Sequence, residues 1–206
     1  MIKEKFGSRL DGVVRFLMPP SLARHLNPNA LTAVGALVSL GAALAFAAGE
    51  LRLGGGLVVL GGFFDLTDGV VARETGRSTT FGAFLDSTLD RFSDLSVLAG
   101  ISIHYAGVGD VALALVAATA LVASALVSYA KARAESVVTL DAGIFERGER
   151  TGVLALGALF GLLPAALVVV ALGASLTVVQ RMALAYRVMQ RLDAAASAER
   201  TEGQSS

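Results

Sequence analysis

The sequence predicts an all-α integral membrane protein, with six transmembrane helices preceded by an N-terminal amphipathic interfacial helix. Of its 206 residues, 54% are hydrophobic and 17% are charged, and the mean hydropathy is +0.68. An ordinary soluble domain has about a quarter of its residues charged. Uncharged runs of twenty residues at 30–49 and 111–130, and of thirty at 151–180, are each long enough to cross a hydrocarbon core of about 30 Å.

Residues 1–20 are expected to form the interfacial helix. Ile2, Phe6 and Leu10 recur at helical spacing while the basic residues lie between them, which is typical of a helix lying in the membrane surface. The double proline at 19–20 ends this helix, because proline lacks the backbone N–H that a helix interior needs. The same pattern leaves open a soluble helix packed on a neighbour.

We place the spanning helices near residues 30–49, 53–74, 81–105, 109–135, 147–163 and 164–190. The run 151–180 is long enough for a single tilted helix, but Gly161 and Pro164 favour a turn within it. Residues 21–192 then form the six-helix domain, and residues 193–206 form a polar C-terminal tail.

The placement of basic residues predicts the orientation. With six spans and both termini in the cytoplasm, sixteen of the seventeen Lys and Arg residues lie inside and only Arg52 lies outside. Cytoplasmic loops of membrane proteins carry such an excess of Lys and Arg. A single pass through 151–180 would move four arginines to the outer side. We therefore expect a multi-pass protein of the cell (inner or plasma) membrane, with its active site and both termini cytoplasmic.

Four aspartates lie beside these apolar runs. Asp65 and Asp68 are three residues apart, and Asp86 and Asp90 are four apart, so each pair shares one helix face. Because the loop between the pairs is short, we expect the four carboxylates to converge at the cytoplasmic interface. Oxygen ligands suit Mg²⁺, Mn²⁺ or Ca²⁺ rather than zinc, and two cations that share carboxylates recur in phosphoryl chemistry.

Two other interpretations of the aspartates have to be weighed. Each can simply pair with an arginine at a helix end, such as Arg73, Arg77 or Arg91. From a different functional class, the aspartates can serve as the relay of a divalent cation transporter. Carboxylates used in transport usually lie near the bilayer centre, whereas these are expected at one interface.

The spacing of the aspartates with their neighbours resembles the signature of the CDP-alcohol phosphotransferase family at every fixed position. The signature reads here Asp65-x-x-Asp68-Gly69-x-x-Ala72-Arg73, eight residues, then Gly82-x-x-x-Asp86-x-x-x-Asp90. The resemblance implies an interfacial helix followed by six spans, and usually a homodimer. It also implies two divalent ions, Mg²⁺ or Mn²⁺, that grip the pyrophosphate of a CDP-linked lipid.

The resemblance assigns roles to particular residues. The metal ligands would be Asp65, Asp68, Asp86 and Asp90, and Asp90 would also be the catalytic base that deprotonates the acceptor hydroxyl. Contacts to the CDP-lipid would come from Pro28, Asn29, Ala30, Leu31, Asp68, Gly69, Ala72, Arg73 and Thr79.

The acceptor is indicated by the segments SYAKARAE (128–135) and IFERGER (144–150) and by Gln180-Arg181. They resemble the phosphatidylinositol phosphate synthase branch of the family and its archaeal ether-lipid counterparts, although Gly148 stands where proline is expected. A basic pocket suits a phosphorylated acceptor. Its residues would be Ser128, Lys131, Arg133, Arg147, Arg150 and Arg181.

We therefore expect the phosphatidyl group of CDP-diacylglycerol to be transferred to inositol 1-phosphate, giving phosphatidylinositol phosphate and CMP. Glycerol 3-phosphate, the acceptor of a phosphatidylglycerophosphate synthase, is the alternative. Membrane lipids are the other expected partners, and no nucleic acid is expected. Asp94, one helical turn after Asp90 but outside the signature, is expected to act as a pairing or supporting group.

Overall fold

The computed structural model of the protein describes residues 26–135, 143 and 145–203. The interfacial helix predicted for residues 1–20 lies outside this part of the chain. The described residues form six helices: α3 (Pro28–Ala47), α4 (Leu51–Thr75), α5 (Thr80–Gly107), α6 (Val111–Ala134), α7 (Arg147–Leu159) and α8 (Leu163–Gly203). The all-α class is confirmed, and each helix corresponds to one predicted span.

A turn separates α7 from α8, so the run 151–180 is two helices rather than one. Gly161 has a φ of 73°, a left-handed conformation that glycine adopts without steric cost. Pro164 lies in the first turn of α8, where its missing N–H is not needed. The two residues that predicted a turn are therefore the residues that form it.

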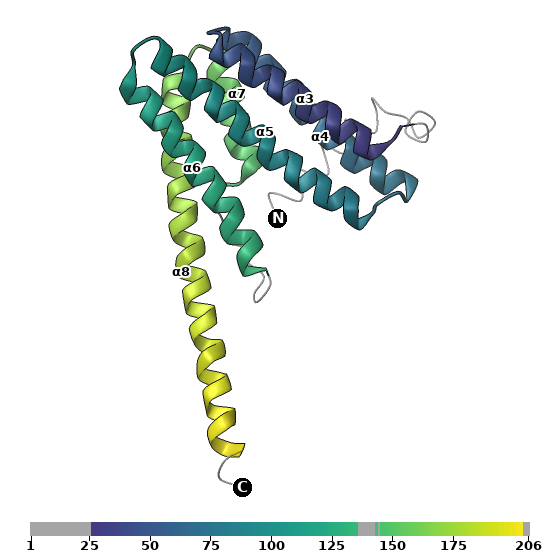
Figure 1. Cartoon of the computed structure of the whole chain (residues 1–206), viewed down its shortest axis with the longest axis vertical. Coiled ribbons are helices and arrows are strands. Elements are labelled where there is room, and N and C mark those ends of the chain that lie inside the picture. The colour runs from purple at the N-terminus through teal and green to yellow at the C-terminus, as the bar shows by residue number, and fades with distance from the viewer. Residues whose placement is uncertain (1–25, 136–142, 144, 204–206) are drawn as a thin grey trace.

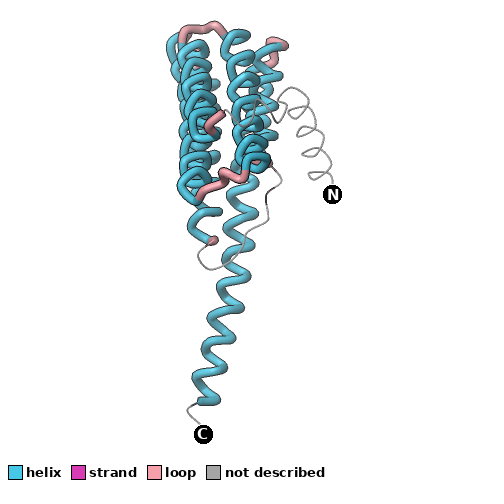
Figure 2. The backbone as a smooth tube through the Cα atoms, turned by 90° about the vertical axis from the view of Figure 1, so that its right-hand side faces the viewer, coloured by secondary structure: helices cyan, strands magenta, loops and turns pink. Residues whose placement is uncertain are grey.

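Two helix lengths differ from the prediction. α7 has 13 residues and ends four residues before the predicted end of its span. α8 has 41 residues and continues as helix into the segment predicted as a polar tail, where it projects well beyond the other helices (Figures 1 and 2).

Four of the helices are long and apolar enough to cross a membrane, namely α3, α4, α6 and the Leu163–Ala194 part of α8. α7 is short, and α5 carries several charged residues in its first half. Large apolar side chains such as Leu37, Leu44 and Leu172 are exposed on the outside of the bundle. Exposed apolar surface on this scale indicates a protein that is surrounded by lipid.

The helices form a closed ring in which each packs against two others. α3 packs on α4 and α5, α4 also on α7, α7 also on α8, and α6 closes the ring between α8 and α5 (Figure 1). Gly100 of α5 crosses α3 so closely that a side chain there would overlap the backbone of Ala43. The close crossing fixes α5 against α3.

The inside of the ring is apolar in one half and polar in the other. The apolar half contains buried residues from all six described helices, among them Phe46, Ile101, Leu154 and Leu167. The polar half contains the aspartates of α4 and α5 and the arginines at the start of α7. Packing in the apolar half stabilises the bundle, so the polar half can contain charged side chains that do not contribute to packing.

Candidate active site

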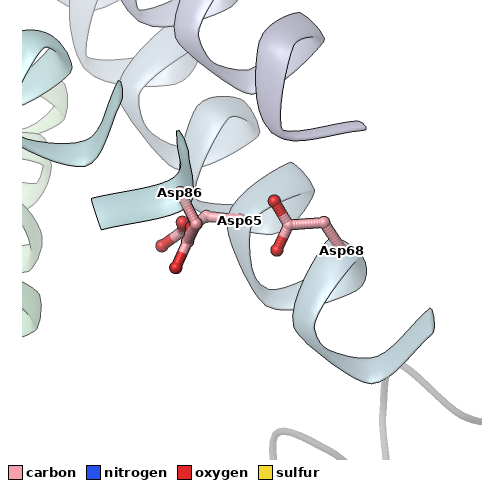
Figure 3. A group of neighbouring side chains, drawn as sticks. All are labelled: Asp65, Asp68 and Asp86. Atoms are coloured by element: carbon pink, nitrogen blue, oxygen red, sulfur yellow. The ribbon is translucent and has the colours of Figure 1, made fainter. Parts of the chain in front are cut away.

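Asp65, Asp68 and Asp86 come together in the polar half. One carboxylate oxygen of each lies within 4.8 Å of the others (Figure 3). Asp65 and Asp68 share a face of α4, and Gly76, with a φ of 63°, ends α4 and lets the chain turn back into α5. Three carboxylates that gather this closely offer the oxygen donor set that hard divalent cations prefer.

Asp68 is also tied to α3. Thr32 donates a hydrogen bond from its hydroxyl to Asp68 Oδ2 at 2.5 Å, and both residues are buried. The bond fixes one carboxylate of the group and links the first turns of α3 to the site. Sequence reasoning missed Thr32; the available signal was its position directly after the predicted donor-binding residues 28–31.

Asp90 lies beside the group of three, with a side-chain hydrogen bond to Asp65, and it also pairs with an arginine. Nη1 of Arg147 lies 2.9 Å from Asp90 Oδ2 and 2.7 Å from Asp65 Oδ2. The same guanidinium reaches Asp94 Oδ1 through Nε at 3.1 Å. Arg147 therefore joins three carboxylates, and it connects Asp90 to the other aspartates through Asp65.

Asp94 links the acidic group to the basic residues of α7. Besides Arg147, its carboxylate accepts from Arg150 Nη2 at 3.3 Å and from the Thr151 hydroxyl at 3.4 Å. The side chain of Arg150 is only 4% exposed, and it also donates to the carbonyl of Phe145 at 3.1 Å. The expectation that Asp94 is a pairing group is confirmed, whereas Thr151 was not foreseen.

Three of the predicted acceptor residues are arginines that the structure brings to the polar half. Arg147 and Arg150 contact the aspartates directly. Arg181 of α8 is 5% exposed and donates to the carbonyl of Val127 at 2.6 Å, and its electrostatic neighbours are Glu146, Arg150 and Glu135. The buried arginines Arg150 and Arg181 thus lie in one region with carboxylates, and their guanidinium groups are of the kind that binds phosphate.

The remaining predicted acceptor residues lie on α6. Lys131 pairs with Glu135 at 3.7 Å, and its side chain is 45% exposed. Arg133 is exposed near the end of the same helix. Ser128 lines a cavity between α5 and α6. The structure thus places Lys131 and Arg133 in exposed positions near the end of α6.

The predicted donor contacts lie at the ends of three helices. Pro28, Asn29, Ala30 and Leu31 form the first turn of α3, and Gly69, Ala72 and Arg73 lie in the last turns of α4. Thr79 caps α5 by accepting a hydrogen bond from Gly82 N at 2.9 Å.

Two signature glycines keep space at these helix ends. A Cβ on Gly82 would lie 3.1 Å from Asn29 Oδ1 and 3.0 Å from Thr79 Oγ1. Glycine at this position therefore lets the starts of α3 and α5 meet closely. Beside Gly69, the nearest atom to an added Cβ is Nη1 at the flexible end of Arg73, at 3.3 Å. The backbone at Gly69 is therefore covered only by the movable end of the Arg73 side chain.

A cavity of about 440 Å³ extends from the site between α4, α5 and α7. Its walls are mainly apolar, with side chains such as Val58 and Leu154, while Asp65, Asp94 and Arg147 line its polar part. A cavity of this size can hold a small ligand. An apolar cavity next to clustered carboxylates suits a substrate with a hydrocarbon part and an anionic head.

Comparison with known proteins agrees with this geometry. Residues 25–190 match the model of the CDP-alcohol phosphatidyltransferase family. The chain belongs to this family. It is therefore a CDP-alcohol phosphatidyltransferase-family enzyme. This family membership replaces the alternative interpretation of the aspartates as the relay of a cation transporter.

Named relatives come from bacteria and archaea. The phosphatidylinositol phosphate synthase of Streptomyces avermitilis is 38% identical, with 86% of this chain and 80% of that protein covered. The archaetidylinositol phosphate synthase of Pyrococcus horikoshii is also 38% identical, with coverages of 82% and 86%. These relatives bear the names of the branch that the acceptor segments resemble.

Solved structures share the fold. The phosphatidylinositol phosphate synthase of Mycobacterium tuberculosis with CDP-DAG bound superposes with a TM-score of 0.75 at 34% identity, covering 86% of this chain and 93% of that one. The same enzyme in complex with manganese and citrate gives a TM-score of 0.76, with coverages of 86% and 88%.

Proposed function

We propose that the protein transfers the phosphatidyl group of CDP-diacylglycerol to a hydroxyl of inositol 1-phosphate, forming phosphatidylinositol phosphate and CMP. The observation that carries the proposal is that a group of carboxylates lies directly beside a group of arginines. The group of Asp65, Asp68 and Asp86 meets the arginines of α7 through Arg147 and Asp94. A cation site for the donor pyrophosphate thus borders an anion site for the phosphate of the acceptor.

The donor would bind at the aspartates. Asp65, Asp68, Asp86 and Asp90 would hold two divalent ions, Mg²⁺ or Mn²⁺, which when bound neutralise charge on the pyrophosphate. The solved M. tuberculosis relative is a complex with manganese, and another of its structures contains CDP-DAG. The part of the acyl chains next to the head group would use the apolar cavity between α4, α5 and α7.

The nucleotide end of the donor would contact residues 28–31 at the start of α3, and Gly69, Ala72, Arg73 and Thr79. The lack of a side chain at Gly69, where the nearest atom to an added Cβ belongs to Arg73, supports close approach of the nucleotide beside this arginine. An arginine such as Arg73 pairs well with phosphate because its guanidinium offers several donors in a fixed plane.

Asp90 would act as the base. Its carboxylate takes the proton of the acceptor hydroxyl, and the resulting oxygen attacks the phosphorus that carries the diacylglycerol. The bond from that phosphorus to the bridging oxygen of CMP breaks, and CMP leaves. The acceptor phosphate would be bound by Arg150 and Arg181, which are largely buried and pre-positioned, with Arg147, Ser128, Lys131 and Arg133 as further predicted contacts.

The acceptor is identified by a panel assay with radiolabelled CDP-diacylglycerol and Mg²⁺ or Mn²⁺. We expect turnover with inositol 1-phosphate to exceed that with glycerol 3-phosphate, serine and free inositol. A preference for glycerol 3-phosphate would instead make the protein a phosphatidylglycerophosphate synthase and refute the proposed acceptor.

The base is tested by release of CMP. Asp90→Ala should abolish it. Asp110→Ala is the matched control, because Asp110 only caps α6 through Leu113 N at 3.0 Å, at the other end of the bundle, and it should retain turnover. Near-normal CMP release by Asp90→Ala would remove Asp90 from the reaction.

We also propose that all six described helices span the membrane, that the site and both termini face the cytoplasm, and that the protein is a homodimer. The four long apolar helices and the charge asymmetry of the sequence support this topology. Because the chain has no cysteine, the single substitutions Ser78→Cys and Val108→Cys can be labelled in intact cells; Val108 is 64% exposed between α5 and α6. An impermeant thiol reagent should label only the Val108→Cys protein; labelling of both variants would refute the orientation.

A further inference from the structure

One guanidinium connects the predicted metal ligands to the predicted acceptor site. Nη1 of Arg147 lies 2.7 Å from Asp65 Oδ2 and 2.9 Å from Asp90 Oδ2, and its Nε lies 3.1 Å from Asp94 Oδ1. Asp65 and Asp90 are predicted metal ligands, whereas Asp94 is outside that set. Asp94 also pairs with Arg150 through Nη2 at 3.3 Å. Arg147 therefore contacts the metal ligands through Nη1 and the partner of Arg150 through Nε.

The Nη1 contacts and a divalent cation oppose each other. Asp65 belongs to the group whose carboxylate oxygens lie within 4.8 Å of one another, so a cation held by this group would lie near Nη1. Like charges at such short range repel strongly where water is partly excluded. A cation bound by Asp65 and Asp90 would therefore weaken the contacts that Arg147 makes with both carboxylates.

The contact with Asp94 is not contested in the same way. Asp94 is outside the predicted ligand set, so a cation at the other aspartates would leave it to Arg147 and Arg150. The backbone at the start of α7 is also fixed, because the N–H of Glu146 donates to the carboxylate of Glu149 in a capping box. An Arg147 side chain that leaves the metal ligands would therefore stay beside Asp94 and Arg150.

Arg147 is more accessible than the other two arginines of the acceptor site in the polar half. Its side chain is 32% exposed, whereas Arg150 and Arg181 are 4% and 5% exposed. An acceptor phosphate that arrives from water would thus meet Arg147 before the two enclosed arginines. As long as Nη1 pairs with Asp65 and Asp90, this donor is occupied and the two carboxylates beside it repel an anion.

We propose that Arg147 couples the two substrate sites: divalent ions bound by the aspartates release its guanidinium, which then binds the phosphate of the acceptor. The proposal rests on the proposed function. Coupling between two sites is reciprocal, so the ions raise the affinity for the acceptor by the same factor by which the acceptor raises the affinity for the ions. The population of the paired over the released guanidinium sets this factor. For two partly screened contacts to carboxylates, it is about 5- to 30-fold.

The test measures binding rather than turnover. Isothermal titration calorimetry of the purified full-length protein in detergent gives the Kd of inositol 1-phosphate, once in EDTA and once in saturating Mn²⁺. The wild-type Kd should be lower in Mn²⁺. Part of this change is the general attraction between added cations and a phosphate, and only this part should remain in Arg147→Gln. The ratio of the two Kd values should therefore be about 5- to 30-fold smaller in Arg147→Gln than in the wild type.

Arg181→Gln is the matched control. Arg181 is another predicted contact of the acceptor phosphate, and its electrostatic neighbours are Glu146, Arg150 and Glu135, which are not predicted metal ligands. Loss of this charge should weaken binding of inositol 1-phosphate equally in EDTA and in Mn²⁺. The ratio of the two Kd values should therefore stay within about twofold of the wild-type ratio. An equal fall of the ratio in both variants would overturn the proposal, because any lost arginine would then have the same effect.

A second measurement needs no variant. Electron paramagnetic resonance of free Mn²⁺ gives the Kd of the ion for the wild type, with and without saturating inositol 1-phosphate. This Kd should fall by the factor that calorimetry finds for the acceptor. If the acceptor leaves Mn²⁺ binding unchanged, the two sites are not coupled and the proposal is wrong.

The outcomes separate this proposal from the proposed function. If inositol 1-phosphate binds and is turned over, but the wild type and Arg147→Gln show the same ratio of Kd values, the proposal is wrong and the proposed function stands. If glycerol 3-phosphate binds instead of inositol 1-phosphate, the proposed acceptor is wrong. The same titrations with glycerol 3-phosphate then decide whether Arg147 couples the sites, because both acceptors carry a phosphate.

Discussion

Replacing Arg147 by glutamine should strengthen the binding of divalent cations. Nη1 of Arg147 lies 2.7 Å from an oxygen of Asp65 and 2.9 Å from an oxygen of Asp90, and both carboxylates are predicted metal ligands. The guanidinium and a bound cation therefore compete for the same carboxylates. A cation that binds the wild type has to displace these contacts, whereas in Arg147→Gln the carboxylates are already available.

The magnitude follows from the two contacts that are lost. A hydrogen bond to a charged group contributes about 1.5–3 kcal/mol when well shielded. The Arg147 side chain is 32% exposed, so solvent screening brings the two contacts together to about 1–2 kcal/mol. At 1.4 kcal/mol for each factor of ten, the Kd for Mn²⁺ should fall by about 5- to 30-fold.

The assay is a titration of purified protein with Mn²⁺, in which electron paramagnetic resonance measures the free ion. Arg150→Gln is the matched control. Arg150 also neutralises an acidic residue in this region, but its carboxylate partner is Asp94, outside the predicted ligand set. Both substitutions remove one positive charge, so a general electrostatic effect would change Mn²⁺ binding in both variants. If direct competition for the carboxylates is the cause, Arg150→Gln should bind Mn²⁺ with a Kd within about twofold of the wild type. Unchanged or weaker Mn²⁺ binding by Arg147→Gln would show that the guanidinium does not compete with the cation.

Three further predictions concern other parts of the site. Asp94→Asn should raise the KM of the acceptor about tenfold, because one charge-assisted bond to the arginines of α7 is lost. The KM of the donor should change little. If the radiometric assay shows equal effects on both KM values, Asp94 has no specific role on the acceptor side. Thr32→Val should lower the stability of the metal-free protein by about 1–3 kcal/mol, since Asp68 loses a buried hydrogen-bond donor. Thermal unfolding in EDTA measures this loss of stability. If the same loss of stability is found in Mn²⁺, the hydrogen bond does not serve the metal-binding aspartates. Gly82→Ala should raise the KM of CDP-diacylglycerol by displacing Asn29, and an unchanged value would show that the helix starts can adjust.

The helices and the gathering of the aspartates could be predicted because both depend on local periodicity. Long uncharged runs mark the helices, and spacings of three and four residues place carboxylates on one face. The partner of Asp90 could not be predicted in this way. Arg147 is 57 positions away along the chain, and its reach to Asp65 and Asp90 follows from the packing of α7 on α4. The same holds for Thr32 and Asp68, which meet only because α3 lies against α4.

The basic residues of the acceptor pocket were only partly distinguished by sequence. The sequence predicts Lys131, Arg133, Arg150 and Arg181 on the same, cytoplasmic side, where an excess of positive charge sets topology as well as function. Burial separates them: Arg150 and Arg181 are enclosed by the ring, whereas Lys131 pairs with Glu135 in an exposed position. Which side of a helix faces inward depends on its neighbours, and a helix such as α6, apolar on nearly every side, gives no sequence pattern that shows it.

The shortness of α7 has a consequence for how the two substrates arrive. Its 13 residues extend over only about 20 Å, some 10 Å less than the hydrocarbon thickness of a bilayer. In the proposed topology, α7 would cross the remaining hydrocarbon only if the membrane surface is depressed at its start, so Arg147 and the reacting groups would lie at the bottom of a depression open to water. A soluble acceptor would then enter this depression from the cytoplasm, whereas a lipid donor would reach the site sideways from the bilayer. The two substrates would have separate entrances, with CMP released into water and the lipid product returned to the membrane.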